Sequence, residues 1–184
     1  MSATTAEEAA MSHYVVLLRG INVGGHRRVP MQALRALAAE LGCRDAQTYV
    51  ASGNLLCTSD EPAHRVEAAF ERALEARFGF AVDVVARSAA QWADYLDSNP
   101  FTAEGEQTPN LVMLCIGKQP ATSEDAATLQ ARAGDNERVV LQGDALWLYF
   151  GDGSGRSKMG VGPSSGVWTT RNLRTVRNLA AMLA

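Results

Sequence analysis

In the first half of the chain, segments of consecutive hydrophobic residues alternate with segments whose hydrophobic residues are spaced as on one face of a helix. Residues 14–19 form a short apolar, β-branched run that predicts a buried strand. A glycine-rich loop follows, and Pro30 then suits the first turn of a helix that ends before Gly42. The elements predicted up to residue 86 are strand, helix, strand, strand, helix and strand, at residues 14–19, 30–41, 47–51, 55–58, 62–78 and 80–86. This order is that of the split βαβ unit of ferredoxin-like folds, with four strands and both helices on one face.

The second half of the chain repeats part of this pattern. Ser88 and Gln91 form a capping box for a helix that ends at Asn99-Pro100. A strand, a helix and two strands are predicted next, at residues 111–116, 123–133, 139–141 and 145–150. The Ser-Gly-Asn turn of the first half corresponds to Gln-Gly-Asp in the second, which indicates a weak internal duplication. The last predicted element is a helix at residues 171–184.

The predicted fold class is therefore α+β. We expect two ferredoxin-like βαββ(αβ) repeats, with antiparallel or mixed sheets packed by helices, plus a C-terminal helical extension. Four segments follow from this: a flexible tail at 1–11, the first repeat at 12–86, the second repeat at 87–150, and a glycine-rich basic loop with the terminal helix at 151–184.

Composition restricts the class of protein. The chain has 184 residues, 47% hydrophobic and 20% charged, a balance typical of a globular protein. No apolar run approaches the roughly 20 residues of a membrane span, and the N-terminus lacks the apolar core of a secretory signal. Cys43, Cys57 and Cys115 lie far apart and form no metal-binding spacing with a histidine. We therefore expect reduced cysteines, a cytoplasmic location, no membrane partner, no metal and no cofactor.

Charge is unevenly distributed along the chain. The net charge is −3, but residues 9–58 carry +3, residues 59–152 carry −9 and residues 153–184 carry +5. This asymmetry predicts either a localised anion site or internal pairing of the basic C-terminal segment with the acidic middle. Arg171 and Arg174 fall in the first turn of the predicted last helix, where each opposes the helix dipole by about 0.3–1 kcal/mol. We expect an acidic side chain, or a bound phosphate or carboxylate, to compensate.

The first candidate site is the loop that follows the first predicted strand. Gly24 and Gly25 would let backbone amides approach an anion at the start of the next helix, and Arg19 and Asn22 add side-chain donors. The glycine spacing matches neither a dinucleotide-binding loop nor a Walker loop. A tight crossover that needs glycine for its backbone angles explains the same residues, so both interpretations stay open.

The second candidate site is the loop at residues 151–158. Arg156, Ser157 and Lys158 are donors suited to an oxyanion, although their spacing is not that of a Walker loop. A solvated surface loop is the alternative. Ser52 and Asn54 lie in a turn that a hairpin explains, and a nucleophilic Ser52 would need a base that the sequence does not identify.

Several short motifs recur together in a way typical of one family. They are LLRGINVGG at 17–25, VPM at 29–31, TYVASGN at 48–54, NPF at 99–101 and GRSKM at 155–159. In these motifs the chain resembles the uncharacterised family DUF1697 over nearly its whole length. The resemblance implies two βαββ-type repeats in paired α+β layers with a C-terminal helical extension, and it implies no activity.

The resemblance is weaker at the last predicted helix. The family typically begins this helix with Arg-Asn-Trp-Asn-Thr, whereas this chain has Leu173 and Arg174 after Arg171 and Asn172. We expect this chain to bind a ligand there differently from its relatives, or not at all.

These observations favour a protein that binds a small phosphate- or carboxylate-bearing ligand. The predicted ligand-binding residues are Arg19, Asn22, Gly24, Gly25, Ser52, Asn54, Arg156, Ser157, Lys158, Arg171 and Asn172. The second hypothesis is an enzyme acting on a phosphorylated or acyl substrate, with no catalytic residue identified. The third is a nucleic-acid or protein-interaction module. Nucleic acid is the least favoured partner, because the total charge is acidic and the first strand lacks the aromatic residues of RNA-binding sheets.

Overall fold

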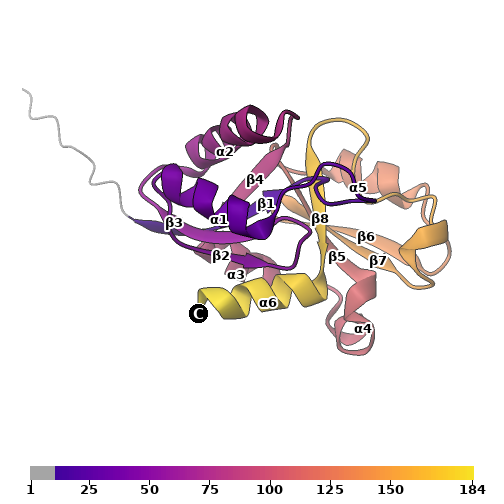
Figure 1. Cartoon of the computed structure of the whole chain (residues 1–184). Helices are drawn as coiled ribbons and strands as arrows, with labels where there is room; N and C mark the ends of the chain where they lie inside the picture. Colours follow the sequence, from indigo (N-terminus) through magenta and orange to yellow (C-terminus); the bar gives the residue numbers. More distant parts are fainter. Residues whose placement is uncertain (1–10) are drawn as a thin grey trace, which may run out of the picture.

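The first of two antiparallel sheets carries two helices on one face (Figure 1). A computed structural model describes residues 11–184, so the tail predicted at the N-terminus lies, except for Met11, outside the described residues. The sheet has the strand order β2-β3-β1-β4, and its elements are β1 (Ser12–Leu18), α1 (Met31–Glu40), β2 (Arg44–Tyr49), β3 (Asn54–Ser59), α2 (Ala63–Phe78) and β4 (Val84–Ser88). Leu34 of α1 and Phe70 of α2 are fully buried in the core beneath them.

The second sheet repeats this strand order with one helix missing. Its order is β6-β7-β5-β8, and its elements are β5 (Val112–Gly117), α5 (Ser123–Gln130), β6 (Glu137–Gln142), β7 (Ala145–Phe150) and β8 (Trp168–Asn172). The first sheet has α2 between its last two strands, whereas the second has a glycine-rich connection at residues 151–167 with one short turn, η2 (Ser154–Arg156). Met159 is fully buried against the second sheet and anchors this connection.

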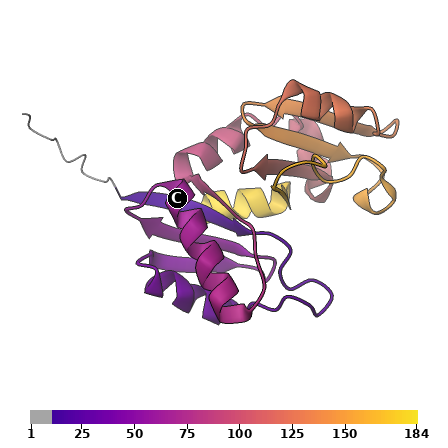
Figure 2. The same cartoon turned by 90° about the horizontal axis from the view of Figure 1, so that it is seen from above.

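A shared core joins the two sheets (Figure 2). The elements around it are α3 (Ala89–Asp97), α4 (Thr102–Gln107), η1 (Pro109–Leu111) and α6 (Leu173–Leu183). Val15 and Leu17 of β1 pack in this core with Trp147 of β7, and the Trp92 indole Nε1 donates to the Val176 carbonyl at 3.1 Å. Both faces of the first sheet are therefore covered, one by α1 and α2 and the other by the shared core.

The α+β class and the strand–helix order of the first half are confirmed, with shifted bounds. Ser88 and Gln91 do form the capping box of α3. The strand predicted at residues 80–86 begins only at Val84. Glu67 and Glu71 of α2 accept hydrogen bonds from the Ala86 and Val84 amides at 2.9 and 3.0 Å. Because β4 is an edge strand, these carboxylates supply acceptors for amides that no neighbouring strand pairs.

The predicted C-terminal helix is present, but it begins later than expected and follows a strand that the sequence analysis did not predict. Residues 168–172 form β8, and α6 begins at Leu173. Asn172 is its N-cap, with Oδ1 accepting from the Thr175 amide at 3.0 Å. Arg171 therefore lies in a strand and does not oppose a helix dipole. Arg174 does lie in the first turn, where its exposed side chain is solvated.

Candidate anion site at the joint between the sheets

Arg171 crosses from the second sheet to the first. Its Nε donates to Asn54 Oδ1 at 2.6 Å, and its Nη2 donates to the Leu18 carbonyl at 2.9 Å. Its Nη1 donates to Thr169 Oγ1 at 2.8 Å and to the Thr170 carbonyl at 2.9 Å. Every one of these acceptors is neutral, and Arg171 forms no ion pair within residues 11–184. Burial lowers the pKa of Arg171 to about 10, so it remains a cation at neutral pH.

The turn that receives Arg171 depends on glycine at position 53. Gly53 has φ +94°, and a Cβ there would lie 2.9 Å from the Leu18 carbonyl oxygen. Asn54 is fully buried, and its Nδ2 donates to the Tyr49 carbonyl and to Ser52 Oγ, both at 3.0 Å. These bonds orient the amide so that Oδ1 points to Arg171. The Ser-Gly-Asn turn predicted from the sequence is thus also the receptor for a side chain from the other sheet.

The same turn contains a strained residue. Val50 has φ +50°, a conformation that β-branched residues rarely adopt, and it is 54% exposed. Such strain costs of the order of 1–3 kcal/mol and persists only where the surroundings enforce it. Asn22 contributes to that enforcement, because its Nδ2 donates to the Ala51 carbonyl at 2.7 Å.

A cavity of about 330 Å³ lies beside Arg171. Three segments that are distant in sequence line it: Arg19-Gly20 after β1, residues 161–163 of the glycine-rich connection, and residues 168–171 of β8. Two predicted ligand-binding residues, Arg19 and Arg171, therefore meet in one wall. None of the lining residues is acidic. The Gly20 and Gly162 amides have no hydrogen-bond partner within the described residues.

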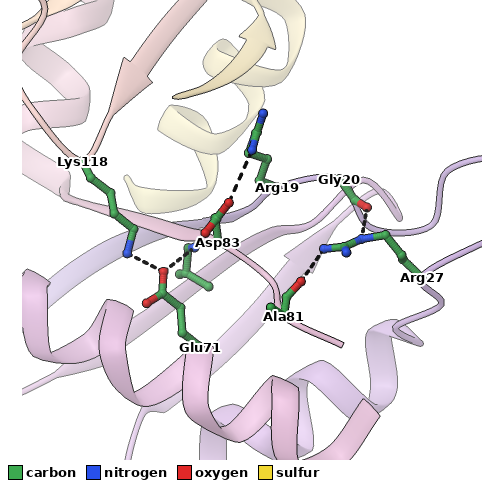
Figure 3. A network of polar contacts seen from close by, with 8 residues as sticks. Arg19, Gly20, Arg27, Glu71, Ala81, Asp83 and Lys118 are labelled. Atoms are coloured by element: carbon green, nitrogen blue, oxygen red, sulfur yellow. Dashed lines mark hydrogen bonds and ion pairs between the residues drawn. The ribbon is translucent and has the colours of Figure 1, made fainter. Parts of the chain in front are cut away.

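Arg19 is the accessible cation of this cavity, and Figure 3 shows its contact with Asp83. Its Nη1 lies 3.4 Å from Asp83 Oδ2, and the two side chains are 53% and 45% exposed. An ion pair of this length and exposure contributes at most about 1 kcal/mol. The Nε and Nη2 atoms of Arg19 have no partner among the residues described. Arg19 can thus exchange Asp83 for a ligand anion at little cost.

Hydrogen bonds from Arg27 fix the loop that carries Arg19. Arg27 Nε donates to the Gly20 carbonyl at 2.9 Å, and its Nη2 donates to the Ala81 carbonyl at 2.6 Å (Figure 3). Lys118, which follows β5, pairs with Glu71 of α2 and ties the two sheets together on the same side. Side-chain contacts therefore fix the loop that carries Arg19 and also link the two sheets.

The remaining residues of the first loop are structural or lie away from the cavity lining. The Asn22 side chain accepts from the Val29 amide at 2.8 Å and donates to the Val29 carbonyl at 3.0 Å, which closes the loop onto the start of α1. Gly24 and Gly25 have φ +58° and +77° in a narrow loop closed by the Val23–His26 bridge. Their geometry fits the tight crossover considered above.

A family model described as "Protein of unknown function (DUF1697)" matches residues 11–147. The chain belongs to the DUF1697 family. The fold of this DUF1697 chain is also that of a conserved bacterial protein from Streptococcus pneumoniae, with a TM-score of 0.76 and 23% sequence identity over 95% of this chain and 100% of that one. No curated protein matches the chain. Arg171 and the glycine-rich connection lie beyond the residues matched by the family model.

The structure does not bring the second predicted loop of this DUF1697 chain into the cavity wall. Arg156 and Lys158 are exposed and have no partner within residues 11–184, and Ser157 Oγ accepts from the Met159 amide at 3.1 Å. Asn172 is occupied as the cap of α6. Of the predicted residues, Arg19 and Arg171 line the cavity, Asn54 and Ser52 support it from the turn, and the others lie elsewhere.

A second buried arginine also joins the two sheets, and sequence analysis did not identify it. Arg87 of β4 donates from Nη2 to the Gly117 carbonyl at 2.6 Å and from Nε to Tyr95 Oη at 2.9 Å. Tyr95 Oη in turn donates to Asp144 Oδ1 at 2.7 Å, and Asp144 Oδ2 lies 3.8 Å from Arg87. Burial raises the pKa of Tyr95 to about 12, so it is a neutral donor here.

The remaining expectations concern cysteines, metals and membranes. Cys43, Cys57 and Cys115 are buried and form no disulfide with one another. In the part of the chain that the structure describes, no three His, Cys, Asp or Glu side chains gather as metal ligands. No helix between residues 11 and 184 is both long enough and apolar enough to cross a membrane.

Proposed function

We propose that the protein binds a small phosphate- or carboxylate-bearing ligand in the cavity between Arg19 and Arg171. The observation that supports this proposal best is the charge of Arg171. Arg87, the other arginine that links the two sheets, has Asp144 as a counter-charge, whereas Arg171 donates only to neutral oxygens. A partly buried cation without a counter-charge creates a positive potential in the cavity, and an anion there would offset it.

The two arginines contribute in different ways. All N–H groups of Arg171 point to protein oxygens, so Arg171 supplies potential rather than free donors. Arg19 supplies the direct contact through its free Nε and Nη2, and the Gly20 and Gly162 amides add backbone donors. Arg156 and Lys158, exposed on the same connection as Gly162, would attract the ligand from solution.

The other two hypotheses have less support. Ser52 Oγ accepts a hydrogen bond from Asn54, and no base contacts it within the described residues, so an activated nucleophile is missing. A nucleic acid could not lie on the first sheet as in RNA-binding modules, because both faces of that sheet are covered.

We also infer that each half is a ferredoxin-like repeat and that the protein is cytoplasmic and bacterial. The shared strand order with helices on one face supports the first inference. Three buried free thiols suit a reducing compartment, and the fold likeness to a bacterial protein fits a bacterial source.

The test is calorimetric titration with inorganic phosphate, ribose 5-phosphate and succinate. We expect at least one to bind, and Arg19→Gln to weaken it about tenfold or more, because a hydrogen bond to a charged group contributes about 1.5–3 kcal/mol. Arg132→Gln is the matched control, since Arg132 is exposed and its side chain has no partner among residues 11–184. Arg156→Ala/Lys158→Ala should weaken binding less than Arg19→Gln, and only at low salt. Binding that is absent for all three ligands, or equal in wild type and Arg19→Gln, contradicts the proposal.

A further inference from the structure

Trp168 forms part of the wall of the same cavity. It is the first residue of β8, and its Nε1 donates to the Ser165 carbonyl at 2.6 Å. Three glycines enclose its side chain. A Cβ at Gly117 would lie 2.7 Å from Cε3, one at Gly162 would lie 3.2 Å from the Trp168 Cβ, and one at Gly166 would lie 3.2 Å from Nε1. These three glycines therefore leave room for the Trp168 indole, because a side chain at any of them would crowd Trp168. Trp168 itself stays partly accessible.

The wall beside the indole is apolar and held in place. Val161 is 53% exposed and lines the cavity together with Pro163. The Val161 carbonyl accepts from Thr170 Oγ1 at 3.0 Å, which fastens the connection to β8. The cavity therefore has a cationic part at Arg19 and Arg171 and an apolar, aromatic part at Trp168, Val161 and Pro163.

The size of the cavity also exceeds what a bare anion needs. Its volume of about 330 Å³ lies at the lower end of the roughly 300–1,000 Å³ typical of small-molecule pockets. Inorganic phosphate would occupy only the cationic part and leave the indole in contact with water.

We infer that the ligand is a phosphate ester with a planar aromatic group, of the size of a nucleoside monophosphate. This inference rests on the proposed function and specifies its ligand. The phosphate lies at Arg19, and the aromatic ring stacks on the part of Trp168 that lines the cavity, since stacking on an indole accepts any flat heterocycle. Because stacking tolerates different rings, the contacts at Trp168 favour ligands that carry an aromatic ring but do not distinguish one nucleobase from another.

The experiment compares AMP, ribose 5-phosphate, adenosine and inorganic phosphate by calorimetry and by tryptophan fluorescence. Trp92 and Trp147 are fully buried, so Trp168 is the indole that a ligand can reach. We expect AMP to bind at least tenfold more tightly than ribose 5-phosphate and to quench the fluorescence. We expect Trp168→Leu to remove this preference while ribose 5-phosphate still binds. Trp168→Phe, which keeps a ring, should retain most of the preference. Arg19→Gln should weaken both phosphates by the same factor.

The outcomes separate the inference from the proposed function. Equal affinities for AMP and ribose 5-phosphate, or a preference unchanged in Trp168→Leu, overturn the inference and leave an anion site. Binding of adenosine as tight as that of AMP overturns the anion site itself. Failure of all four compounds to bind overturns both.

Discussion

Arg87 and Arg171 occupy equivalent places in the two sheets. Arg87 pairs with Val15 across β4 and β1, and Arg171 pairs with Leu114 across β8 and β5. Each guanidinium donates from Nη1 to the carbonyl of the residue before it, and from Nη2 to the last residue of the central strand of the other sheet, Gly117 or Leu18. The two sheets, which share one strand order, thus also have matching arginine contacts.

The two joints differ in the turn residue near the arginine and in how the arginine reaches it: Arg171 Nε donates directly to Asn54, whereas Arg87 Nε donates to Tyr95, which donates to Asp144. Asn54 ends the Ser-Gly-Asn turn of the first sheet, and Asp144 ends the Gln-Gly-Asp turn of the second. The aspartate neutralises Arg87, whereas the asparagine leaves Arg171 charged. Arg87 therefore belongs to an ion pair, whereas Arg171, which meets an amide where Arg87 has a carboxylate nearby, is a source of positive potential beside a cavity. The comparison teaches that two arginines with matching backbone contacts can differ in whether their charge is neutralised.

The largest expected effect comes from removing either arginine. Arg171→Met leaves the buried Asn54 oxygen and the Leu18 carbonyl without donors, and we expect it to destabilise the protein by about 2–4 kcal/mol, the combined cost of two unsatisfied acceptors. Arg87→Met should cost a similar amount if the joints are equivalent. Urea unfolding at constant ionic strength measures both. A loss below about 1 kcal/mol for Arg171→Met, similar to that of the exposed control Arg132→Met, would show that the guanidinium does not hold the joint.

Exchanging the turn residues tests the difference in charge directly. Asn54→Asp supplies the missing counter-charge, and we expect it to weaken phosphate binding at least tenfold in calorimetry. It also removes the Nδ2 donors to Tyr49 and Ser52, so a stability loss of about 1–3 kcal/mol should accompany it.

The reciprocal variant Asp144→Asn is the matched control for this exchange. It removes the charge beside Arg87 and should leave the phosphate affinity of the Arg171 cavity unchanged. An Asn54→Asp protein that is folded and binds phosphate like wild type would refute the role of the uncompensated charge.

The smallest expected effect concerns Asp83. Asp83→Asn removes the carboxylate that competes with a ligand for Arg19, and we expect phosphate affinity to rise by up to about fivefold, in keeping with an exposed ion pair of at most about 1 kcal/mol. The effect should shrink as salt is raised, because exposed charges are screened. Unchanged or lower affinity at low salt would mean that Asp83 positions Arg19 rather than competing for it. Asp60→Asn, whose ion pair with Arg44 is also exposed, serves as the control.

Local patterns predicted much of the fold. The apolar run of β1, the helical spacing of α2 and the capping box of α3 each depend on residues close in sequence. β8 could not be found in this way. Residues 168–172 form a strand because they pair with β5, more than fifty residues earlier in the chain, and because Asn172 starts the next helix. The run Val167-Trp168-Thr169-Thr170, made only of residue types favoured in strands, was the local signal for this strand.

The candidate site was also predictable only in part, because it is built by contacts between residues that lie far apart in the sequence. Arg19 and Arg171 stand out in the sequence as cations in acid-free segments, and the SGN turn is recognisable as a turn. Arg156 and Lys158 carry the same chemistry, yet they do not line the cavity, because the connection is anchored by Met159 and turns back over Trp168. Asn22 and Asn172 were candidates as donors, and their side chains are used within loops and caps.

The sequence by itself determined the family, the α+β class, the order of elements in the first half and the two related turns, because these follow from short motifs and from the periodicity of neighbouring residues. Only the tertiary structure decided which cations carry an uncompensated charge. Whether an arginine is neutralised depends on the group that meets it in space, and for Arg171 that group, Asn54, lies 117 residues away in the chain.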